Sequence, residues 1–276
     1  MIEQTEIVRR RFDAEATQWD QRYQAESDSI YTANLLSRKR AATSFAAGIK
    51  GRVLDLACGA GNVALSIDQT PGARLFGADL SLEMLRRSRQ NARTRHRTLR
   101  LLNADALNLP FVAGSFEGIL CLGLLDYITA HLTLLKECHR VLRPGGRIIV
   151  SIPNARSPFV RIDDLGFGIK NAFTQSLPQG LRAWLKRELL GKQDDQHYAY
   201  RKHRYNPDIF AAQLSRMGFQ VSDRMYMTYG FGILNRSRLN KRFGQYLSSR
   251  CRHSLAVERT GWTQILQAIR LPQQSH

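Results

Sequence analysis

The stretch VLDLACGAGN, from Val53 to Asn62, joins a short apolar strand to a turn that contains Gly59 and Gly61. Glycine adopts positive φ at little cost, so such a turn can bring backbone N–H groups close to a ligand. The helix expected after the turn adds unpaired N–H groups and the positive end of a dipole. We therefore expect a binding site at the carboxyl end of this strand.

Asp55 lies near the end of the same strand and is expected to place a fixed negative charge beneath the turn. The turn also has the spacing GxGxxA of a dinucleotide site, with Ala64 in third place, but a carboxylate facing a pyrophosphate is unfavourable. The acid instead favours a ligand with both a carboxylate and a cation, as S-adenosylmethionine has. Asp79 ends the next strand in FGADLS, where its carboxylate can accept hydrogen bonds from both ribose hydroxyls.

Outward from this motif, strand-like and helix-like segments alternate, as they do in parallel α/β proteins. The segments predicted to be strands are 53–57, 73–79, 98–104, 116–122, 147–152, 219–225 and 263–269. Apolar residues at helical spacing predict a helix over 131–142, and Asn206, Pro207 and Gly218 mark the ends of another over 207–217. The fold class is therefore α/β: a Rossmann-like, seven-stranded, mostly parallel sheet with helices on both faces.

The same pattern divides the chain into four consecutive regions. Residues 1–50 form an N-terminal helical cap, 51–153 the cofactor-binding core, 154–205 a helical lid or acceptor insertion, and 206–276 the completion of the core sheet. In the cap, Val8, Phe12, Trp19 and Tyr23 recur at helical spacing, which suits core packing as well as a lid over a ligand.

Asp105 follows the third predicted strand in NADALNLPF. It can accept a hydrogen bond from an adenine amino group, while Leu80, Met84 and Ala106 supply apolar surface for the ring. An acid that caps a helix or stabilises a loop is an equally good interpretation of Asp105.

The chain of 276 residues has a formal net charge of +18, which favours association with phosphates, anionic lipids or acidic small molecules. Four scattered cysteines without a CxxC pair, and the lack of HExxH or an acidic calcium loop, give no indication of a metal site or a disulfide scaffold. No apolar run is long enough to span a membrane, so we expect a cytoplasmic protein. Peripheral contact with the membrane surface is compatible with this location. The basic amphipathic segment 176–192 suits such a membrane contact or a buried lid helix.

Taken together, these residues resemble the class I S-adenosylmethionine-dependent methyltransferases over roughly Val53 to Pro153. Four blocks match in order: DLACGAG, GADLS, NADALNLPF, and SFEGILCLGLLDYI followed by LLKECHRVLRPGGRIIVSIPN. The resemblance implies S-adenosylmethionine as cofactor, an antiparallel last strand, and acceptor contacts from the N-terminal helix and the insertion. The cofactor-binding residues it implies are Asp55, Ala57, Gly59, Gly61, Asp79, Leu80, Met84, Asp105, Ala106 and Leu122. Ala57 departs from the pattern, because the family often has its first glycine there.

The overall layout looks, more loosely, like the methyltransferases of the ubiquinone-biosynthesis O-methyltransferase type, which implies O-methylation of a small or lipid-like acceptor. A phenolic acceptor needs a general base. His197 and His203, among tyrosines in the insertion, are candidates, and so is Asp126, just after the fourth strand. Asp126 could equally cap the helix that follows it.

Two other functions remain open at this point. Seven arginines between Arg86 and Arg100 could bind a nucleic acid, although a solvated helix face explains them as well. The segment after the fourth strand, CLGLLDYI, lacks the NPPY-like tetrapeptide of amino-methylating nucleic-acid enzymes, which makes a nucleic-acid partner an unfavoured alternative. A non-catalytic cofactor-binding or assembly protein is the other alternative.

Overall fold

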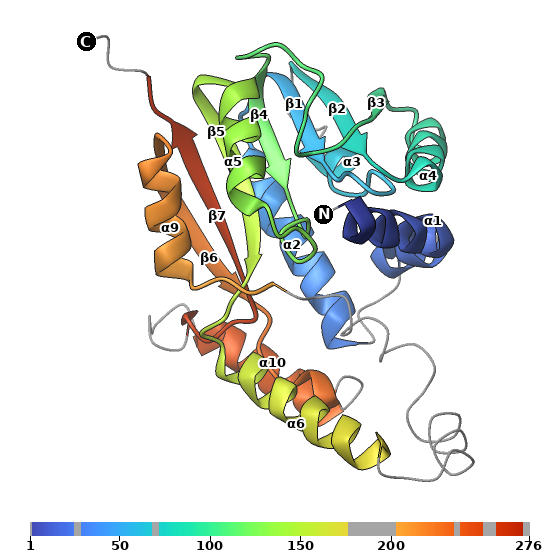
Figure 1. Ribbon diagram of the computed structural model, residues 1–276, viewed down its shortest axis with the longest axis vertical. Helices are drawn as coiled ribbons and strands as arrows, with labels where there is room; N and C mark the ends of the chain where they lie inside the picture. The colour runs from blue at the N-terminus through green and yellow to red at the C-terminus, as the bar shows by residue number, and fades with distance from the viewer. Residues whose placement is uncertain are drawn as a thin grey trace.

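The computed structural model describes residues 2–24, 29–67, 72–175, 203–234, 238–250 and 258–272 (Figure 1). The strands are β1 (Gly51–Leu56), β2 (Ala73–Asp79), β3 (Leu99–Asn103), β4 (Phe116–Cys121), β5 (Leu142–Pro153), β6 (Phe219–Met227) and β7 (Thr263–Arg270). The helices are α1 (Ile2–Gln24), α2 (Ile30–Ala46), α3 (Ala64–Ile67), α4 (Leu82–Thr94), α5 (His131–Val141), α6 (Pro158–Gln175), α9 (Pro207–Arg216) and α10 (Arg238–Arg250), with a 3-10 turn, η1 (Gly232–Leu234).

The strands form one seven-stranded sheet in the order β3-β2-β1-β4-β5-β7-β6. Only β7 runs antiparallel to its neighbours β5 and β6, and the other pairs are parallel. Strands β2 and β3 lie on one side of β1 in the sheet, and β4 lies on its other side, so the strand order reverses at β1. Such a point of reversal opens a crevice at the carboxyl ends of the strands, where α/β proteins bind ligands.

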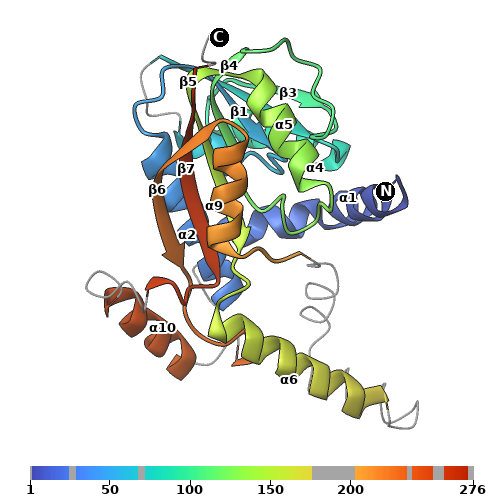
Figure 2. The same cartoon turned by 60° about the vertical axis from the view of Figure 1, so that its left-hand side comes forward.

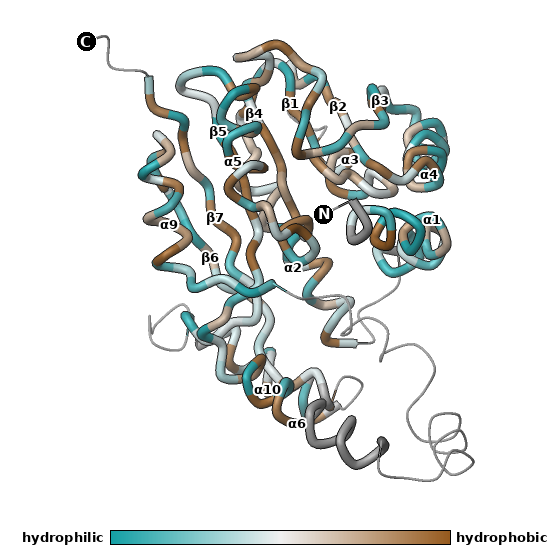
Figure 3. The backbone as a smooth tube through the Cα atoms, viewed as in Figure 1, coloured by the Kyte–Doolittle hydropathy of each residue, from teal (hydrophilic) through white to brown (hydrophobic). Residues whose placement is uncertain are grey.

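Alternating side chains on the strands build a hydrophobic core on each face of the sheet. On one face, Leu54, Ile119 and Ile148 pack with α5 and α9. On the other, Val53 and Leu120 pack with the apolar side of α2. Because successive strand residues point to opposite faces, both faces of the central strands are apolar. Figure 3 shows apolar colouring along β4. The sheet therefore gives rigid support to the side chains and loops at the carboxyl ends of its strands.

All seven predicted strands and the helices predicted near 131–142 and 207–217 are confirmed. The fifth strand is longer than predicted: it begins at Leu142, which pairs with Phe116, and an irregularity precedes the pairing of Arg147 with Gly118. The predicted stop signal, Pro144 with two glycines, thus lies inside a bulged strand.

Helices α6 and α10 lie side by side, away from the sheet, as both ribbon views show (Figures 1 and 2). A third apolar cluster, which contains Ile30, Phe159, Val160, Tyr229 and Trp262, connects them to the start of α2. Among the described residues, no helix has the length and apolar character needed to cross a bilayer. The predicted basic helix at 176–192 lies outside the described residues.

Candidate functional site

The glycine turn after β1 has the backbone that the sequence predicts. Gly59 has φ +53° and Gly61 has φ +76°. Ala57 also has positive φ, +56°, although it is not glycine. A left-handed conformation costs about 1 to 2 kcal/mol in a residue with a Cβ atom. The turn thus keeps a strained residue at the position where the resembling family often has glycine.

The Asp79 carboxylate joins the end of β2 to this turn. It accepts a hydrogen bond from the Gly59 backbone N–H at 2.8 Å and another from the Ser81 N–H at 2.9 Å. Burial raises the pKa of Asp79, against the opposing effect of these two hydrogen bonds. A carboxylate has about four lone-pair positions, so capacity for ligand hydroxyls remains. Asp79 lines the hollow in front of the turn, where the sequence places a ribose-binding acid.

Asp55 is more deeply enclosed than the sequence suggests. Its side chain is 3% exposed and accepts a hydrogen bond from the Ala64 N–H at 3.2 Å. Burial raises its pKa to about 7, and the neighbouring charge of Asp79 adds to the shift. Burial therefore favours the neutral form of Asp55 and opposes the fixed negative charge expected from the sequence. A cation in the hollow would favour the charged form.

Gly61 has a packing role that the sequence did not predict. A Cβ atom at Gly61 would lie 2.5 Å from the Ser88 Oγ atom of α4 and 3.2 Å from Leu99. The glycine therefore lets α4 and β3 pack closely against the turn. It is not among the described residues that line the hollow, and its contact with a cofactor stays a prediction.

The remaining residues predicted to bind a cofactor lie around the same hollow. Lining residues from that prediction are Asp55, Ala57, Gly59, Asp79, Leu80, Met84, Asp105, Ala106 and Leu122. Asp105 also stabilises its own loop, because its Oδ1 atom accepts a hydrogen bond from the Leu107 N–H at 2.9 Å. Its loop role is thus present in the structure, and its contact with adenine stays a prediction.

Helix α1 lies across the hollow and closes one side of it. Thr5, Val8, Arg9, Phe12, Trp19 and Tyr23 contribute to the lining. The ring of Phe12 contacts that of Tyr127 edge to face, with centroids 5.3 Å apart, so α1 meets the loop after β4. Of the two interpretations of the N-terminal helix, the structure supports the lid.

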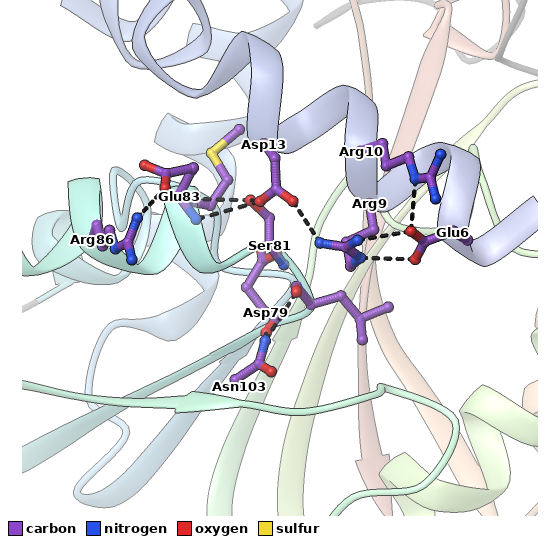
Figure 4. A network of polar contacts seen from close by, with 11 residues as sticks. Glu6, Arg9, Arg10, Asp13, Asp79, Ser81, Glu83, Arg86 and Asn103 are labelled. Atoms are coloured by element: carbon purple, nitrogen blue, oxygen red, sulfur yellow. Dashed lines mark hydrogen bonds and ion pairs between the residues drawn. The ribbon is translucent and has the colours of Figure 1, made fainter.

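Two buried or half-buried carboxylates attach this lid to the site. Asp13 accepts a hydrogen bond from the Ser81 Oγ at 2.6 Å and pairs with Arg9 at 2.7 Å, as Figure 4 shows. Asp20, fully buried, accepts from the side-chain amides of Asn62 at 2.8 Å and Asn91 at 2.9 Å. Because Asn62 belongs to the glycine turn and Asn91 to α4, Asp20 couples the position of α1 to the ligand-binding backbone.

Arg38 of α2 is a site residue that the sequence analysis missed. It lines the hollow, is only 6% exposed, and its Nε atom has no hydrogen-bond partner among the described residues. A Cβ atom at Gly123 would lie only 2.6 Å from the Nη1 atom of Arg38. The missing side chain of Gly123 therefore leaves space for the guanidinium group. A buried guanidinium whose Nε–H group has no acceptor among the described residues is costly, which makes Arg38 a candidate binding group for an anion.

The loop after β4 provides the other side of the hollow, through Leu124, Asp126, Tyr127 and Ile128. Asp126 is 4% exposed. It does not cap α5, whose N-cap residue is Ala130 without a side-chain hydrogen bond, so that interpretation of Asp126 is wrong. Behind the loop, burial foremost and the charge of Asp126 raise the pKa of Tyr205 to about 12.

The two histidines proposed as bases do not gain support. His203 is half-buried and is not one of the described residues that line the hollow. His197 lies outside the described residues. Of the three catalytic candidates, Asp126 alone is placed at the hollow by the described structure.

The hollow encloses about 1250 Å³ of space between atoms, part of it open to solvent. Its groups fit an amino-acid nucleoside such as S-adenosylmethionine: Asp55 suits an ammonium group, the buried guanidinium of Arg38 a carboxylate, and Asp79 a ribose.

A family model described as a methyltransferase domain matches residues 53–146. Residues 53–146 form a class I methyltransferase domain. The match covers β1 to the start of β5, the part of the chain that contributes all of the predicted cofactor-binding residues. The resemblance inferred from the sequence blocks is thereby confirmed.

Curated relatives align with less than half of the chain. A demethylmenaquinone methyltransferase of Thermus thermophilus is 38% identical over 122 residues, 44% of this chain and 55% of that protein. A ubiquinone/menaquinone biosynthesis C-methyltransferase of Syntrophotalea carbinolica is 38% identical over 102 residues, 36% of this chain and 43% of that protein. The chain spans about half the length of the curated relatives it matches.

Solved structures share the fold over nearly the whole chain. Magnesium protoporphyrin IX methyltransferase of Synechocystis, solved with bound S-adenosylhomocysteine, has a TM-score of 0.62 at 16% identity and covers 97% of this chain and 99% of its own. A SAM-dependent methyltransferase of Thermotoga maritima has a TM-score of 0.60 at 15% identity, with 94% and 97% covered. At such identities the likeness establishes the fold.

Proposed function

We propose that this protein transfers a methyl group from S-adenosylmethionine to a small, lipid-like acceptor with an acidic hydroxyl group. The observation that carries the proposal is the hollow itself, in which Asp55, Asp79 and the buried Arg38 surround one space at the carboxyl ends of the central strands. The methyltransferase domain over 53–146 and the quinone-related names of the aligned proteins agree with it.

S-adenosylmethionine, when bound, supplies an electrophilic methyl group on a positively charged sulfur. Asp55 and Arg38 orient its amino-acid end, and Asp79 holds its ribose. Leu80, Met84 and Ala106 cover the base. Fixing two reactants in contact can replace several kcal/mol of activation free energy, so these residues act mainly by orientation.

Asp126 is the proposed general base of the reaction. Asp126 lines the hollow and lies on the loop after β4, where the ring of Tyr127 contacts Phe12 of α1. There it can take the proton of an acceptor hydroxyl group within hydrogen-bond reach. The lid α1 excludes water from this proton transfer, because Phe12 and Trp19 cover the hollow.

The acceptor offers two atoms to the methyl group. A deprotonated phenol can react at its oxygen or at a neighbouring ring carbon. The layout of the sequence favours O-methylation, whereas an aligned relative is named a C-methyltransferase. We keep oxygen as the proposed atom, and the products distinguish the two, because an O-methyl ether loses the acidic hydroxyl and a C-methyl product retains it.

The test is incubation of the purified protein with S-adenosylmethionine and a series of hydroxylated aromatic and quinol acceptors, followed by mass spectrometry. A product heavier by one CH2 group is expected with wild type. The Asp126→Asn variant should lose product formation and keep its affinity for S-adenosylhomocysteine. Methylation of RNA but of none of these acceptors would replace the proposal with the nucleic-acid alternative. Cofactor binding without methylation of either acceptor class would support the non-catalytic alternative.

A further inference from the structure

Helix α10 carries exposed apolar side chains on one face. Leu239 is 77% exposed, Tyr246 55% and Phe243 42%. They are separated by four and three residues, so they share one side of the helix. The other side is fixed to the protein through Asn240, which is 4% exposed and accepts a hydrogen bond from the Phe231 N–H at 2.9 Å. The apolar face of α10 is therefore held toward solvent.

Helix α6 repeats this arrangement beside it. Ile162 is 49% exposed and Leu165 66%, while Phe159 and Val160 belong to the buried cluster. The rings of Phe159 and Phe243 lie 6.2 Å apart, which joins the two helices. We call the exposed side chains Ile162, Leu165, Leu239, Phe243 and Tyr246 the apolar face of the α6–α10 arm.

The charge on the arm is positive. Helix α10 contains Arg238, Lys241, Arg242 and Arg250 and no acidic residue. The two acids of α6 are already engaged: Asp163 is fully buried and accepts a hydrogen bond from the Gly232 N–H at 2.6 Å, and Asp164 pairs with Arg204. The partner of this surface must therefore accept apolar side chains and supply negative charge.

The arm lies at the same edge of the sheet as the hollow. Helix α6 follows the carboxyl end of β5, and α10 lies between the carboxyl end of β6 and the amino end of the antiparallel β7. All three of these strand ends lie at the edge where β1, β2 and β4 end. Figure 1 shows α6 and α10 beyond this edge of the sheet.

We propose that the apolar face of the α6–α10 arm docks onto an anionic lipid bilayer. Apolar side chains on a basic helix enter the boundary of headgroups and acyl chains, and each Lys or Arg near an anionic surface adds about 1 kcal/mol of attraction. A symmetric dimer through this face would bring two positively charged helices together, which is unfavourable. The inference does not depend on methyl transfer, because it rests on exposed residues outside the hollow.

Vesicle sedimentation tests the proposal directly. The protein is mixed with vesicles of phosphatidylcholine alone or of phosphatidylcholine with phosphatidylglycerol, at low and at high salt. We expect binding to the anionic vesicles that weakens with salt, because charge attraction is screened. The double variant Leu165→Glu with Leu239→Glu should bind them at least fivefold less tightly. Val112→Glu is the matched control, because Val112 is 79% exposed on the loop before β4, at the opposite edge of the sheet.

Unfolding temperatures and stabilisation by S-adenosylhomocysteine serve as folding checks and should be the same in all variants. Equal vesicle binding by wild type and the double variant, or no binding to anionic vesicles at all, would overturn the proposal. So would a variant with Arg182, Lys186 and Arg187 changed to glutamate that loses all binding while the double variant keeps it. A dimer in solution that the double variant disrupts, without vesicle binding, would assign the face to a second copy of the chain and overturn the proposal as well.

Discussion

The Asp55→Asn exchange tests the electrostatics of the hollow in both the free and the bound protein. The amide has the same shape as the carboxyl group and can still accept the hydrogen bond from the Ala64 N–H. It lacks the negative charge, whose burial raises the pKa of Asp55 from 3.8 to about 7. At about 1.4 kcal/mol per pKa unit, the buried charged form is disfavoured by about 4 kcal/mol.

The sign of the pH dependence follows from this shift. A carboxyl group with a folded-state pKa above its unfolded value binds a proton on folding, so it stabilises the fold most at low pH. That contribution is lost as the pH rises from about 4 to about 7. Asp55→Asn has no such loss. Its free energy of unfolding, relative to wild type, should therefore increase by about 2.5 kcal/mol between about pH 5 and about pH 8.

Urea unfolding of both proteins across this pH range measures the difference, and other titrating groups cancel because both proteins contain them. Asp223→Asn, the same exchange at an exposed position of β6, is the control. In calorimetry, wild type should bind S-adenosylhomocysteine more tightly as Asp55 loses its proton, and Asp55→Asn should bind it at least tenfold more weakly at about pH 8. A stability difference that does not change with pH would refute the argument for Asp55.

Three further substitutions examine other parts of the site. Arg38→Gln should weaken binding of S-adenosylhomocysteine at least tenfold by calorimetry, because the ion pair between the buried guanidinium and the carboxylate of the ligand is lost. Unchanged affinity would show that Arg38 does not bind the cofactor. Ala57→Gly should raise the free energy of unfolding by about 1 kcal/mol in urea, since φ is +56° there, and a less stable variant would contradict the strain. Asp20→Ala should speed amide hydrogen exchange in α1 severalfold, because Asn62 and Asn91 lose their acceptor, and equal exchange rates would show that Asp20 does not hold the lid.

The sheet was predictable from the sequence because both of its signals are local. Short apolar segments mark the strands, and Gly59 and Gly61 mark the turn after β1. The carboxyl ends of parallel strands meet at one edge, so the positions of Asp55, Asp79 and Asp105 along the chain predicted that they lie at one hollow. The spacing of Phe12 and Trp19 predicted the N-terminal helix, although not whether it packs in the core or covers a ligand site.

Properties that depend on distant parts of the chain were not predictable in this way. The protonation of Asp55 depends on how completely α3, α1 and the turn enclose it, and a sequence pattern does not record that enclosure. Arg38 lies in the run Arg38-Lys39-Arg40, which has no motif, and its burial arises from the missing side chain of Gly123. The close approach of Ser88 and Leu99 to Gly61, which Gly59 lacks, likewise depends on residues distant in the sequence.

Titration calorimetry with S-adenosylhomocysteine tests most directly whether the hollow is a cofactor site. Wild type should bind one molecule per chain, and Asp79→Ala should bind at least tenfold more weakly while it unfolds cooperatively. A nicotinamide dinucleotide should produce no heat of binding with either protein. Binding of the dinucleotide by wild type, without binding of S-adenosylhomocysteine, would contradict the proposed cofactor and with it the proposed reaction.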